Sequence, residues 1–303
     1  AAIVEKIQLD IEIPQFLVSN ARHALAIVAG NFYNHPSRHM KMIGITATNG
    51  KTTTSFMIDN ILQTYELKTG IVGTVLIRLG DEQIASDLTT PESLDLQYYL
   101  NRMKENNLSH VIMEISSSAI ELNRIAGINY DIVAFNNISR EHIDLHGSFE
   151  NYLNLKSSLI TNAKQGSWAV LNMDSAGSAA LTDKTEANVL TYGVNNKNAM
   201  IICKNLDLST GRGNFTVEIA KPFSVNGDMY DIQEFDIKLA VPGYHSVYNA
   251  MVAISIALIC KVPIEIIKNS FTTFKGVERR FEFIYEKDFK IIDDHFANTG
   301  NID

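Results

Sequence analysis

Short apolar runs and helix-like spacing alternate from about residue 42 to residue 160. The runs MIGI (42–45), VIMEI (111–115) and DIVAF (131–135) each end where polar residues begin. The segment after the first run, SFMIDNILQTY, places its apolar residues mostly along one helical face. This alternation predicts an α/β fold, with a mostly parallel sheet and flanking crossover helices. Because ligands of such folds bind beyond the carboxyl ends of the strands, the polar residues after each run mark the candidate site.

The pattern changes after WAVLN (168–172). Apolar and polar residues then alternate over 215–219 and again over 235–239, which predicts a small antiparallel sheet. The stretch from Val247 to Leu258 has helical character, and FEFIY and FKIID near the end predict two more strands.

The segment Thr90-Pro91-Glu92 has the composition of a helix start. Threonine is a favoured N-cap, proline is favoured at the first helical position, and an acid suits the first turn. We therefore expect a helix that begins here, with Thr90 as its cap.

Composition and charge narrow the class of protein. The chain has 303 residues, of which 46% are hydrophobic and 20% charged, and no apolar run approaches the roughly 20 residues that span a bilayer. We expect a soluble, cytoplasmic protein without membrane insertion. The formal net charge of -8 argues against a nucleic-acid surface. The two cysteines, Cys203 and Cys260, lie outside any metal spacing and are expected to be buried free thiols.

The sharpest chemical signal is GITATNGKTTT, from Gly44 to Thr54, between an apolar strand and an amphipathic helix. Such a loop directs backbone N–H groups and the positive end of the helix dipole at a phosphate. Lys51 would neutralise the outer phosphates, and Thr52 would offer its hydroxyl to Mg²⁺. The general phosphate-loop pattern is incomplete because Ile45 stands where its first glycine should be, so a plain turn before a helix is the alternative.

This loop resembles the T-G-T-N-G-K-T loop of Mur ligases, with Ala47 in place of the usual glycine. The resemblance continues through most of the chain and is closest to the branch that extends UDP-N-acetylmuramoyl-L-alanyl-D-glutamate. It implies a P-loop-type ATP-binding fold. The nucleotide-binding residues that it implies are Thr46, Thr48, Asn49, Gly50, Lys51, Thr52, Thr53 and Asn137.

Two further segments resemble the family's catalytic motifs. Glu114 ends VIMEI and is followed by three serines, like the family's M-E-[VI]-S-S segment, and Phe135 to Lys156 resembles its T-N-L-S-R-D-H-L-D-Y-H-G segment and downstream lysine. By this match the metal ligands are Thr52, Glu114, His142 and a carbamylated Lys156. The catalytic residues are Lys51, Glu114, His142 and Lys156. Without the resemblance, Glu114 and Lys156 would be interpreted as solvated or paired surface groups.

The acceptor site is implied by DLTTPES and by the residues after Glu114. Thr89, Thr90, Ser116 and Arg124 match positions that bind the UDP-muramoyl peptide, and a guanidinium fork suits a carboxylate. Thr90 could instead only cap its helix, and Arg124 could only pair on the surface. Ser118 departs from the family, since a histidine is frequent there.

The resemblance also divides the chain. Residues 1–38 correspond to the last part of an N-terminal uridine-binding domain, 39–278 to the central ATP-binding domain and 279–303 to the start of a C-terminal domain, so we expect partial domains at both ends. VPGYHSVYNA and VERRFEFI match the late central motifs. IIDDHFANTGNID matches poorly, because Ala297 stands where a nucleotide-contacting histidine is expected.

The expected activity is an ATP-dependent amide ligase of peptidoglycan synthesis. It would use ATP and Mg²⁺ to add an amino acid, lysine or diaminopimelate, through an acyl phosphate, and would act as a monomer. Two alternatives stay open. One is a related ligase with a pseudomurein, polyglutamate or cyanophycin-type acceptor, and the other is a nucleotide-binding scaffold without catalysis.

Overall fold

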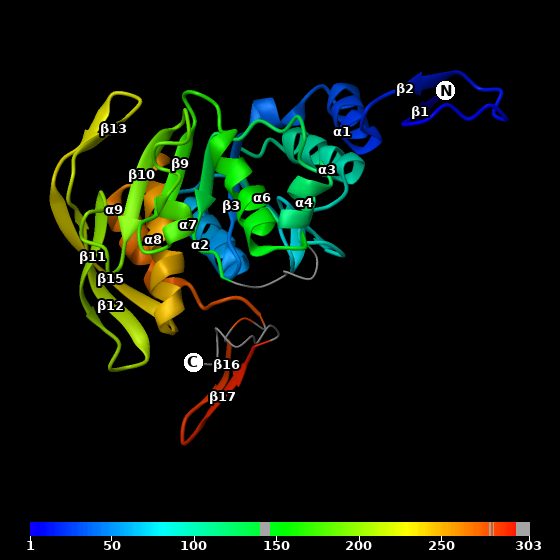
Figure 1. Cartoon of the computed structure of the whole chain (residues 1–303). Helices are drawn as coiled ribbons and strands as arrows, with labels where there is room; N and C mark the ends of the chain where they lie inside the picture. Colours follow the sequence, from blue (N-terminus) through cyan, green and yellow to red (C-terminus); the bar gives the residue numbers. More distant parts are fainter. Residues whose placement is uncertain (140–145, 279, 281, 295–303) are drawn as a thin grey trace.

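An eleven-stranded sheet organises the chain, of which the computed structural model describes residues 1–139, 146–278, 280 and 282–294 (Figure 1). In order across the sheet, the strands are β15 (Gln233–Pro242), β12 (Arg212–Ile219), β11 (Ile201–Asp207), β10 (Asn188–Gly193), β9 (Trp168–Asn172), β8 (Ile132–Phe135), β3 (Lys41–Thr46), β7 (His110–Glu114), β4 (Thr69–Val72), β5 (Leu76–Leu79) and β6 (Glu82–Ala85). The strands from β11 to β4 are parallel to their neighbours, and the pairs at both edges are antiparallel. The mostly parallel sheet predicted from the sequence is confirmed.

The two faces of the sheet carry separate cores. Ile43 and Ile45 of β3 pack into one cluster, whereas Met42 packs into the other, because successive side chains of a strand point to opposite faces. The first face is covered by α2 (Lys51–Thr64), α8 (Tyr244–Ile259) and α9 (Ile264–Thr273). The second is covered by α3 (Ser93–Glu105) and α6 (Phe149–Thr161). The other helical segments are α1 (Ala21–Phe32), η1 (Pro36–His39), α4 (Ser117–Glu121) and α7 (Ala176–Ala179).

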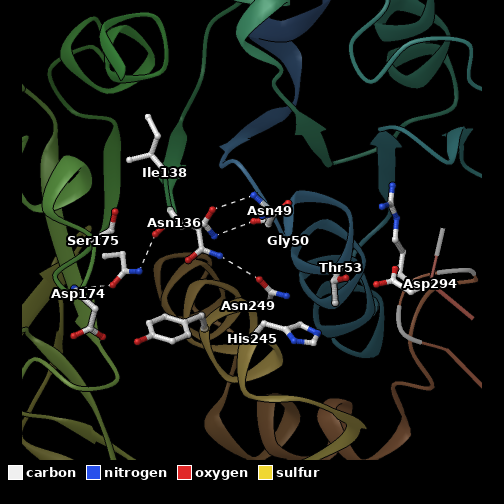
Figure 2. A pocket seen from close by; sticks show the side chains of 14 residues that line it. Asn49, Gly50, Thr53, Asn136, Ile138, Asp174, Ser175, His245, Asn249 and Asp294 are labelled. Atoms are coloured by element: carbon white, nitrogen blue, oxygen red, sulfur yellow. Dashed lines mark hydrogen bonds between the residues drawn. The ribbon is translucent and has the colours of Figure 1, made fainter. Parts of the chain in front are cut away.

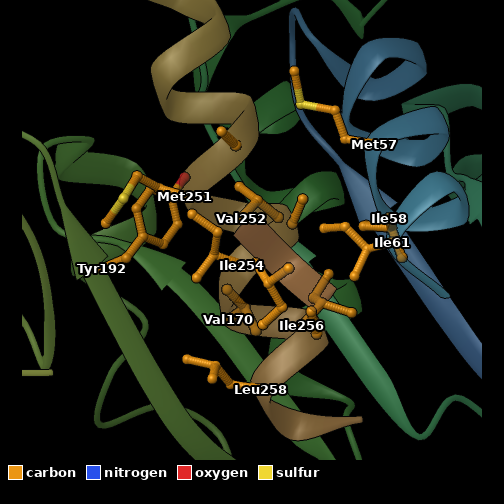
Figure 3. Packing of buried hydrophobic residues seen from close by; sticks show 14 of the residues in the cluster. Met57, Ile58, Ile61, Val170, Tyr192, Met251, Val252, Ile254, Ile256 and Leu258 are labelled. Carbon is orange, nitrogen blue, oxygen red and sulfur yellow. The ribbon is translucent and has the colours of Figure 1, made fainter. Parts of the chain in front are cut away.

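Helix α8 lies in the middle of the first core (Figure 3). It packs against α2, α9 and the sheet, and most of its residues are buried. Figure 3 shows Met251 and Ile254 of α8 on the side of Tyr192 of the sheet, within the same buried cluster. The apolar character around this helix therefore follows from its central position. The predicted helix over Val247–Leu258 is confirmed.

The antiparallel strands predicted after residue 172 are β12 and β15. Phe215 pairs with Ile237 and Val217 pairs with Phe235, and all four side chains are buried. These strands continue the large sheet through the parallel ladder between β10 and β11. A separate ribbon, β13 (Phe223–Val225) with β14 (Asp228–Tyr230), adds a second antiparallel pairing.

Two small sheets lie near the ends of the described chain (Figure 1). β1 (Ala2–Val4) pairs in parallel with β2 (Gln15–Leu17). β16 (Glu282–Glu286) pairs antiparallel with β17 (Lys290–Asp293), as FEFIY and FKIID predict.

The predicted start of α3 is wrong by a few residues. The helix begins at Ser93 with Glu92 at the cap position, and Glu92 makes no side-chain cap bond. The Thr90 hydroxyl instead donates to the Glu114 carbonyl at 2.8 Å and accepts from the Ser116 N–H at 3.2 Å. Because this hydroxyl joins two other segments, it is not available to cap α3.

Cys203 and Cys260 are buried free thiols, as expected. Burial raises the pKa of Cys203 to about 11 and that of Cys260 to about 12, so both stay protonated and unreactive at neutral pH. Within the described ranges, no helix has both the length and the apolar character that crossing a bilayer requires.

His110 makes the stability of the fold pH-dependent. Burial, and secondarily the charge of Lys41, lower the pKa of this histidine from 6.5 to about 4. Between these values the unfolded chain binds a proton that the folded chain does not, so stability falls as the pH falls from 6.5 towards 4 and changes little below. The loss is about 3 kcal/mol, from 1.36 kcal/mol per pKa unit.

We expect His110→Gln to flatten this dependence because glutamine does not titrate. The measurement is urea unfolding at pH 7.0 and pH 4.5, with His39→Gln, a change at an exposed histidine, as the control. Equal losses of stability in His110→Gln and the unchanged protein would show that other groups cause the acid sensitivity.

Candidate active site

The phosphate loop connects β3 to α2, as predicted. Gly50 caps α2 in the left-handed region with φ of 85°, a conformation that glycine adopts without a Cβ clash. The first N–H groups of α2 have no partners within the helix and, with the helix dipole, are placed to bind an anion. Lys51 Nζ donates to the carbonyls of Ala47 at 2.9 Å and Thr48 at 3.1 Å, so the ammonium lies over the loop.

Asn137 fixes the shape of this loop. Its Oδ1 accepts from the N–H groups of Thr48 at 3.1 Å and Asn49 at 3.0 Å, and its Nδ2 donates to the Asn49 carbonyl at 2.9 Å. Asn137 follows β8, the neighbour of β3 in the sheet. The structure therefore brings Asn137 to the loop and gives it a positioning role. Its contact with a nucleotide stays a prediction.

Glu114 lies fully buried at the carboxyl end of β7, facing the start of α2. It accepts from the Thr52 hydroxyl at 2.9 Å, from the Thr74 hydroxyl at 3.0 Å and from the Thr74 N–H at 3.0 Å. Gly73 permits this approach, since a Cβ there would lie 2.3 Å from Glu114 Oε1. Sequence reasoning missed Thr74, which carries no motif of its own.

Magnesium fits the chemistry of this pair. Thr52 Oγ1 and Glu114 Oε2 are 2.9 Å apart, and both are hard oxygen ligands of the kind that Mg²⁺ takes alongside phosphate and water. The described part of the chain contains no group of three or more histidine, cysteine or acidic side chains that could together hold a metal ion. The other two predicted ligands are Lys156, which lies on α6, and His142, which lies outside the described residues.

Lys156 lies on α6 and its side chain points back to the phosphate loop. The residue is 1% exposed, and Nζ donates to the Ala47 carbonyl at 2.9 Å and to the Thr46 hydroxyl at 3.3 Å. The ammonium also lies 4.9 Å from the centre of the Tyr152 ring. Lys156 is therefore not a solvated surface lysine: the residue is buried, and its terminal nitrogen is hydrogen-bonded to the loop.

The residues predicted to bind the acceptor lie close to Thr74 and Glu114. Thr89 Oγ1 is 3.1 Å from Thr74 Oγ1, and the Ser116 hydroxyl caps α4 by accepting from the Ala119 N–H at 3.1 Å. Arg124 pairs with Glu92 at 2.8 Å, and Nη1 donates to the Thr90 carbonyl at 3.3 Å. Its Nε is buried without a partner among the described residues. The structure thus brings all four residues to one side of the loop.

Two adjoining cavities surround the loop. The smaller, of about 240 Å³, is lined by loop residues together with Thr74, Thr89, Glu114, Ser116, Ser117, Ser118, Tyr152, Lys156 and Arg280. The larger, of about 360 Å³, lies on the α8 side (Figure 2). Asn49, Gly50 and Arg280 line both. The predicted residues Thr48, Lys51 and Thr52 line the smaller cavity, whereas Thr53 and Asn137 line the larger one.

The larger cavity has a floor of amide and hydroxyl groups that the sequence did not predict. Asn136 Nδ2 donates to Asn249 Oδ1 at 3.1 Å, and Oδ1 accepts from the Tyr192 hydroxyl at 2.6 Å. Asn249 Nδ2 is buried and has no partner in the described part of the chain, so it suits an acceptor atom of a ligand. Burial lowers the pKa of His245, which also lines the cavity.

His245 and Asn249 could have been identified from the segment VPGYHSVYNA, which contains both and matches a family motif. Asp294 lines the same cavity. Ala297, the departure noted in the sequence, lies outside the described residues.

Gly50→Ala is expected to weaken both the fold and nucleotide binding. A Cβ there would lie 2.3 Å from Asn249 Oδ1, in a backbone with φ of 85°. The left-handed backbone costs about 1 to 2 kcal/mol for a residue with a Cβ, and the clash moves Asn249 away from the cavity. Gly166→Ala is the matched control, since its φ is 86° and nothing lies within 4 Å.

Urea unfolding and calorimetry with Mg·ATP check this expectation. Both variants should lose stability, but only Gly50→Ala should lose nucleotide affinity, by about tenfold or more if one good hydrogen bond is removed. Equal nucleotide affinity in the two variants would show that Gly50 does not contribute to nucleotide binding.

Comparison with known proteins identifies the family of this chain. The family model described as the Mur ligase middle domain matches residues 45–257. A UDP-N-acetylmuramoyl-L-alanyl-D-glutamate 2,6-diaminopimelate ligase of Bacillus licheniformis is 33% identical over 306 residues, which cover 99% of this chain and 60% of that protein. The ligase of the same name from Caldanaerobacter subterraneus is 38% identical over 286 residues, covering 93% of this chain and 56% of that protein.

Solved structures show the same fold. A structure of a UDP-N-acetylmuramoyl-L-alanyl-D-glutamate 2,6-diaminopimelate ligase superposes with a TM-score of 0.77 at 21% identity, covering 94% of this chain and 57% of that one. The MurF ligase of Thermotoga maritima in complex with ADP gives a TM-score of 0.69 at 19% identity, covering 98% of this chain and 62% of that one. The chain thus spans less than two thirds of the length of these proteins. Its matched segment and its fold together show that this chain belongs to the Mur ligase family and contains the family's middle domain.

Proposed function

We propose that this chain carries the ATP-binding and acceptor-binding core of an enzyme that joins an amino acid to UDP-N-acetylmuramoyl-L-alanyl-D-glutamate. The observation that carries the proposal is the convergence of Lys51, Thr52, Glu114 and Lys156 on one cavity beside the phosphate loop. Diaminopimelate is the favoured amino acid because the relatives quoted above are named for it. In this proposal residues 1–38 belong to a uridine-binding domain, 39–278 to the ATP-binding domain and 279–303 to the start of an amino-acid-binding domain.

ATP would occupy both cavities. The phosphates would lie over the N-terminus of α2, where Lys51 and the first N–H groups of the helix stabilise negative charge. The rest of the nucleotide would extend into the larger cavity, where Asn249 Nδ2 is a buried donor without a protein partner among the described residues. The neutral state of His245 at pH 7, which follows from its lowered pKa, suits contact with an uncharged base.

The acceptor would bind on the Thr89 side of the smaller cavity. Its D-glutamyl carboxylate attacks the γ-phosphorus of ATP, ADP leaves, and an acyl phosphate forms. The amino group of the incoming amino acid then attacks the acyl carbon, and phosphate leaves as the amide forms. Lys51 stabilises the negative charge on the transferred phosphoryl group, which is the main contribution that a protein makes to such a reaction.

Thr52 and Glu114 would hold Mg²⁺, with Thr74 orienting the carboxylate. When bound, the metal neutralises phosphate charge and aligns the γ-phosphate. His142 and carbamylated Lys156 are proposed as further ligands.

Acceptor-dependent turnover tests the proposal. The full-length protein is incubated with Mg·ATP, UDP-N-acetylmuramoyl-L-alanyl-D-glutamate and either diaminopimelate or lysine, and products are identified by mass spectrometry. We expect ADP, phosphate and one new amide bond, all dependent on the acceptor. ATP hydrolysis at a rate that does not depend on the acceptor, with no amide product, would contradict the proposed function.

A further inference from the structure

Three side chains outside the predicted catalytic set form a connected chain. Ser117 Oγ lies 2.9 Å from His146 Nε2, and His146 Nδ1 lies 3.2 Å from Glu121 Oε2. The His146 side chain is 1% exposed and stacks on the Tyr152 ring with 5.4 Å between ring centres. Buried ring nitrogens usually have hydrogen-bond partners. Ser117 provides one at Nε2, and the Glu121 carboxylate lies near Nδ1.

The neighbours of His146 determine which nitrogen carries its proton. A carboxylate 3.2 Å from Nδ1 attracts a proton to that atom, although the two groups are not aligned for a full hydrogen bond and Nδ1 has no such bond in the described structure. With the proton on Nδ1, Nε2 is an acceptor. The Ser117 hydroxyl then donates to Nε2, which leaves the oxygen lone pairs of Ser117 as its remaining hydrogen-bonding capacity.

Ser117 also lines the smaller cavity, together with Lys51, Glu114 and Lys156. Phosphate and carboxylate ligands are acceptors, so they are matched by the donors of the phosphate loop. A serine oxygen that can only accept does not suit them. It suits a ligand that donates, and the donor in amide formation is the attacking amine.

We propose that Ser117, His146 and Glu121 form a relay that removes the proton of the attacking amine. This inference rests on the proposed function. As the amine nitrogen bonds to the acyl carbon and the carbon–oxygen bond to phosphate breaks, an amine proton passes to Ser117 Oγ. The Ser117 proton passes to His146 Nε2 at the same time, so the serine ends unchanged and the imidazole becomes a cation beside Glu121.

The charged and titratable groups around His146 suit this role. Glu121 of α4 faces Nδ1 and stabilises the cation. Tyr152 of α6 covers the ring face, and the Lys156 side chain contacts the same tyrosine ring. Ser117 contacts the amine, whereas His146 and Glu121 act through it.

The experiment compares two nucleophiles in the full-length protein. Hydroxylamine is largely unprotonated at neutral pH and captures an acyl phosphate without a base, whereas the amino group of an amino acid is mostly protonated and needs one. Hydroxamate and amide formation are measured for the unchanged protein, Ser117→Ala and His146→Gln. Glutamine can still accept from Ser117 but cannot take up a proton. His110→Gln, at the opposite end of β7, is the control for loss of a buried histidine.

We expect both relay variants to form hydroxamate at near the unchanged rate and to lose amide formation by about 100-fold or more, the usual size of general-base catalysis. Amide formation by His146→Gln should recover as the pH rises and the amine deprotonates in solution. His110→Gln should form both products normally.

Three results would overturn the relay. These are amide formation at the unchanged rate in both variants, equal loss of hydroxamate and amide, or no recovery at high pH. Thermal melting of each variant separates misfolding from loss of the relay, and Ser117→Ala serves if His146→Gln does not fold. Absence of hydroxamate with the unchanged protein would instead refute the proposed function itself.

Discussion

Lys51→Ala is expected to lower the affinity for Mg·ATP by about 10-fold to 100-fold, since a hydrogen bond to a charged group contributes about 1.5 to 3 kcal/mol. Turnover should fall by about 100-fold or more, as happens when one donor to developing charge is removed. The physical reason is the position of Nζ over the loop, within 3.1 Å of the Ala47 and Thr48 carbonyls. No other lysine except Lys156 lines the same cavity within the described ranges.

Calorimetry and steady-state assays of the full-length protein measure both effects. Lys268→Ala is the matched control, because Lys268 is also a helix lysine but pairs with Glu265 at the surface. Lys51→Ala should also lose some folding stability, because the Ala47 and Thr48 carbonyls lose a donor. Unchanged nucleotide affinity together with unchanged turnover would show that Lys51 does not bind the phosphates of ATP.

The fold was predictable where a pattern is long or continuous. The runs that became β3, β7 and β8 are apolar because both faces of these strands are covered, which is the condition that a parallel sheet imposes. The four-residue strands β4, β5 and β6 were not predicted. Short segments such as Glu82–Ala85, which is mostly exposed, carry too few buried positions to show a period.

The site was predictable where its residues share one segment. Lys51 and Thr52 follow from the loop between β3 and α2, whereas Thr74 was missed. Thr74 is 40 positions from Glu114 in sequence and reaches it only because β4 lies beside β7 in the sheet. The order of strands, which local patterns do not specify, therefore determines this contact.

The floor of the larger cavity was not predicted for the same reason: local sequence patterns do not show which distant segments meet. Asn136 directly follows β8, whereas Tyr192 belongs to β10 and Asn249 to α8. The three meet through two hydrogen bonds that span 56 and 113 residues. Seen alone in the sequence, none of the three residues is marked by its local pattern of apolar and polar residues. Their common role becomes visible when the sheet and α8 are packed together.

Substitution of Lys156 is the second change that we expect to have a large effect on turnover, because we expect this lysine to carry a carbamate. A carbamate converts the ammonium into an anion, and an anion beside Thr52 and Glu114 suits a second Mg²⁺ near the γ-phosphate. The buried position of Nζ, at the edge of a cavity that Glu114 and Thr52 also line, supports the proposal. A buried side chain of this kind is also shielded from the solvent that would otherwise hydrate its terminal group.

Lys156→Ala should be inactive in the full-length protein, with turnover reduced by about 1,000-fold or more if a metal ligand is lost near the transferred phosphoryl group. Short carboxylic acids should restore part of the activity by supplying the missing anion. Lys156→Arg is the matched variant, since arginine keeps the positive charge but forms no carbamate, and it should be as inactive as Lys156→Ala. Incorporation of ¹³C-labelled carbon dioxide, detected by NMR in the unchanged protein and absent from both variants, checks the modification directly. Full activity of Lys156→Arg would show that a cation is sufficient at this position and would exclude the carbamate.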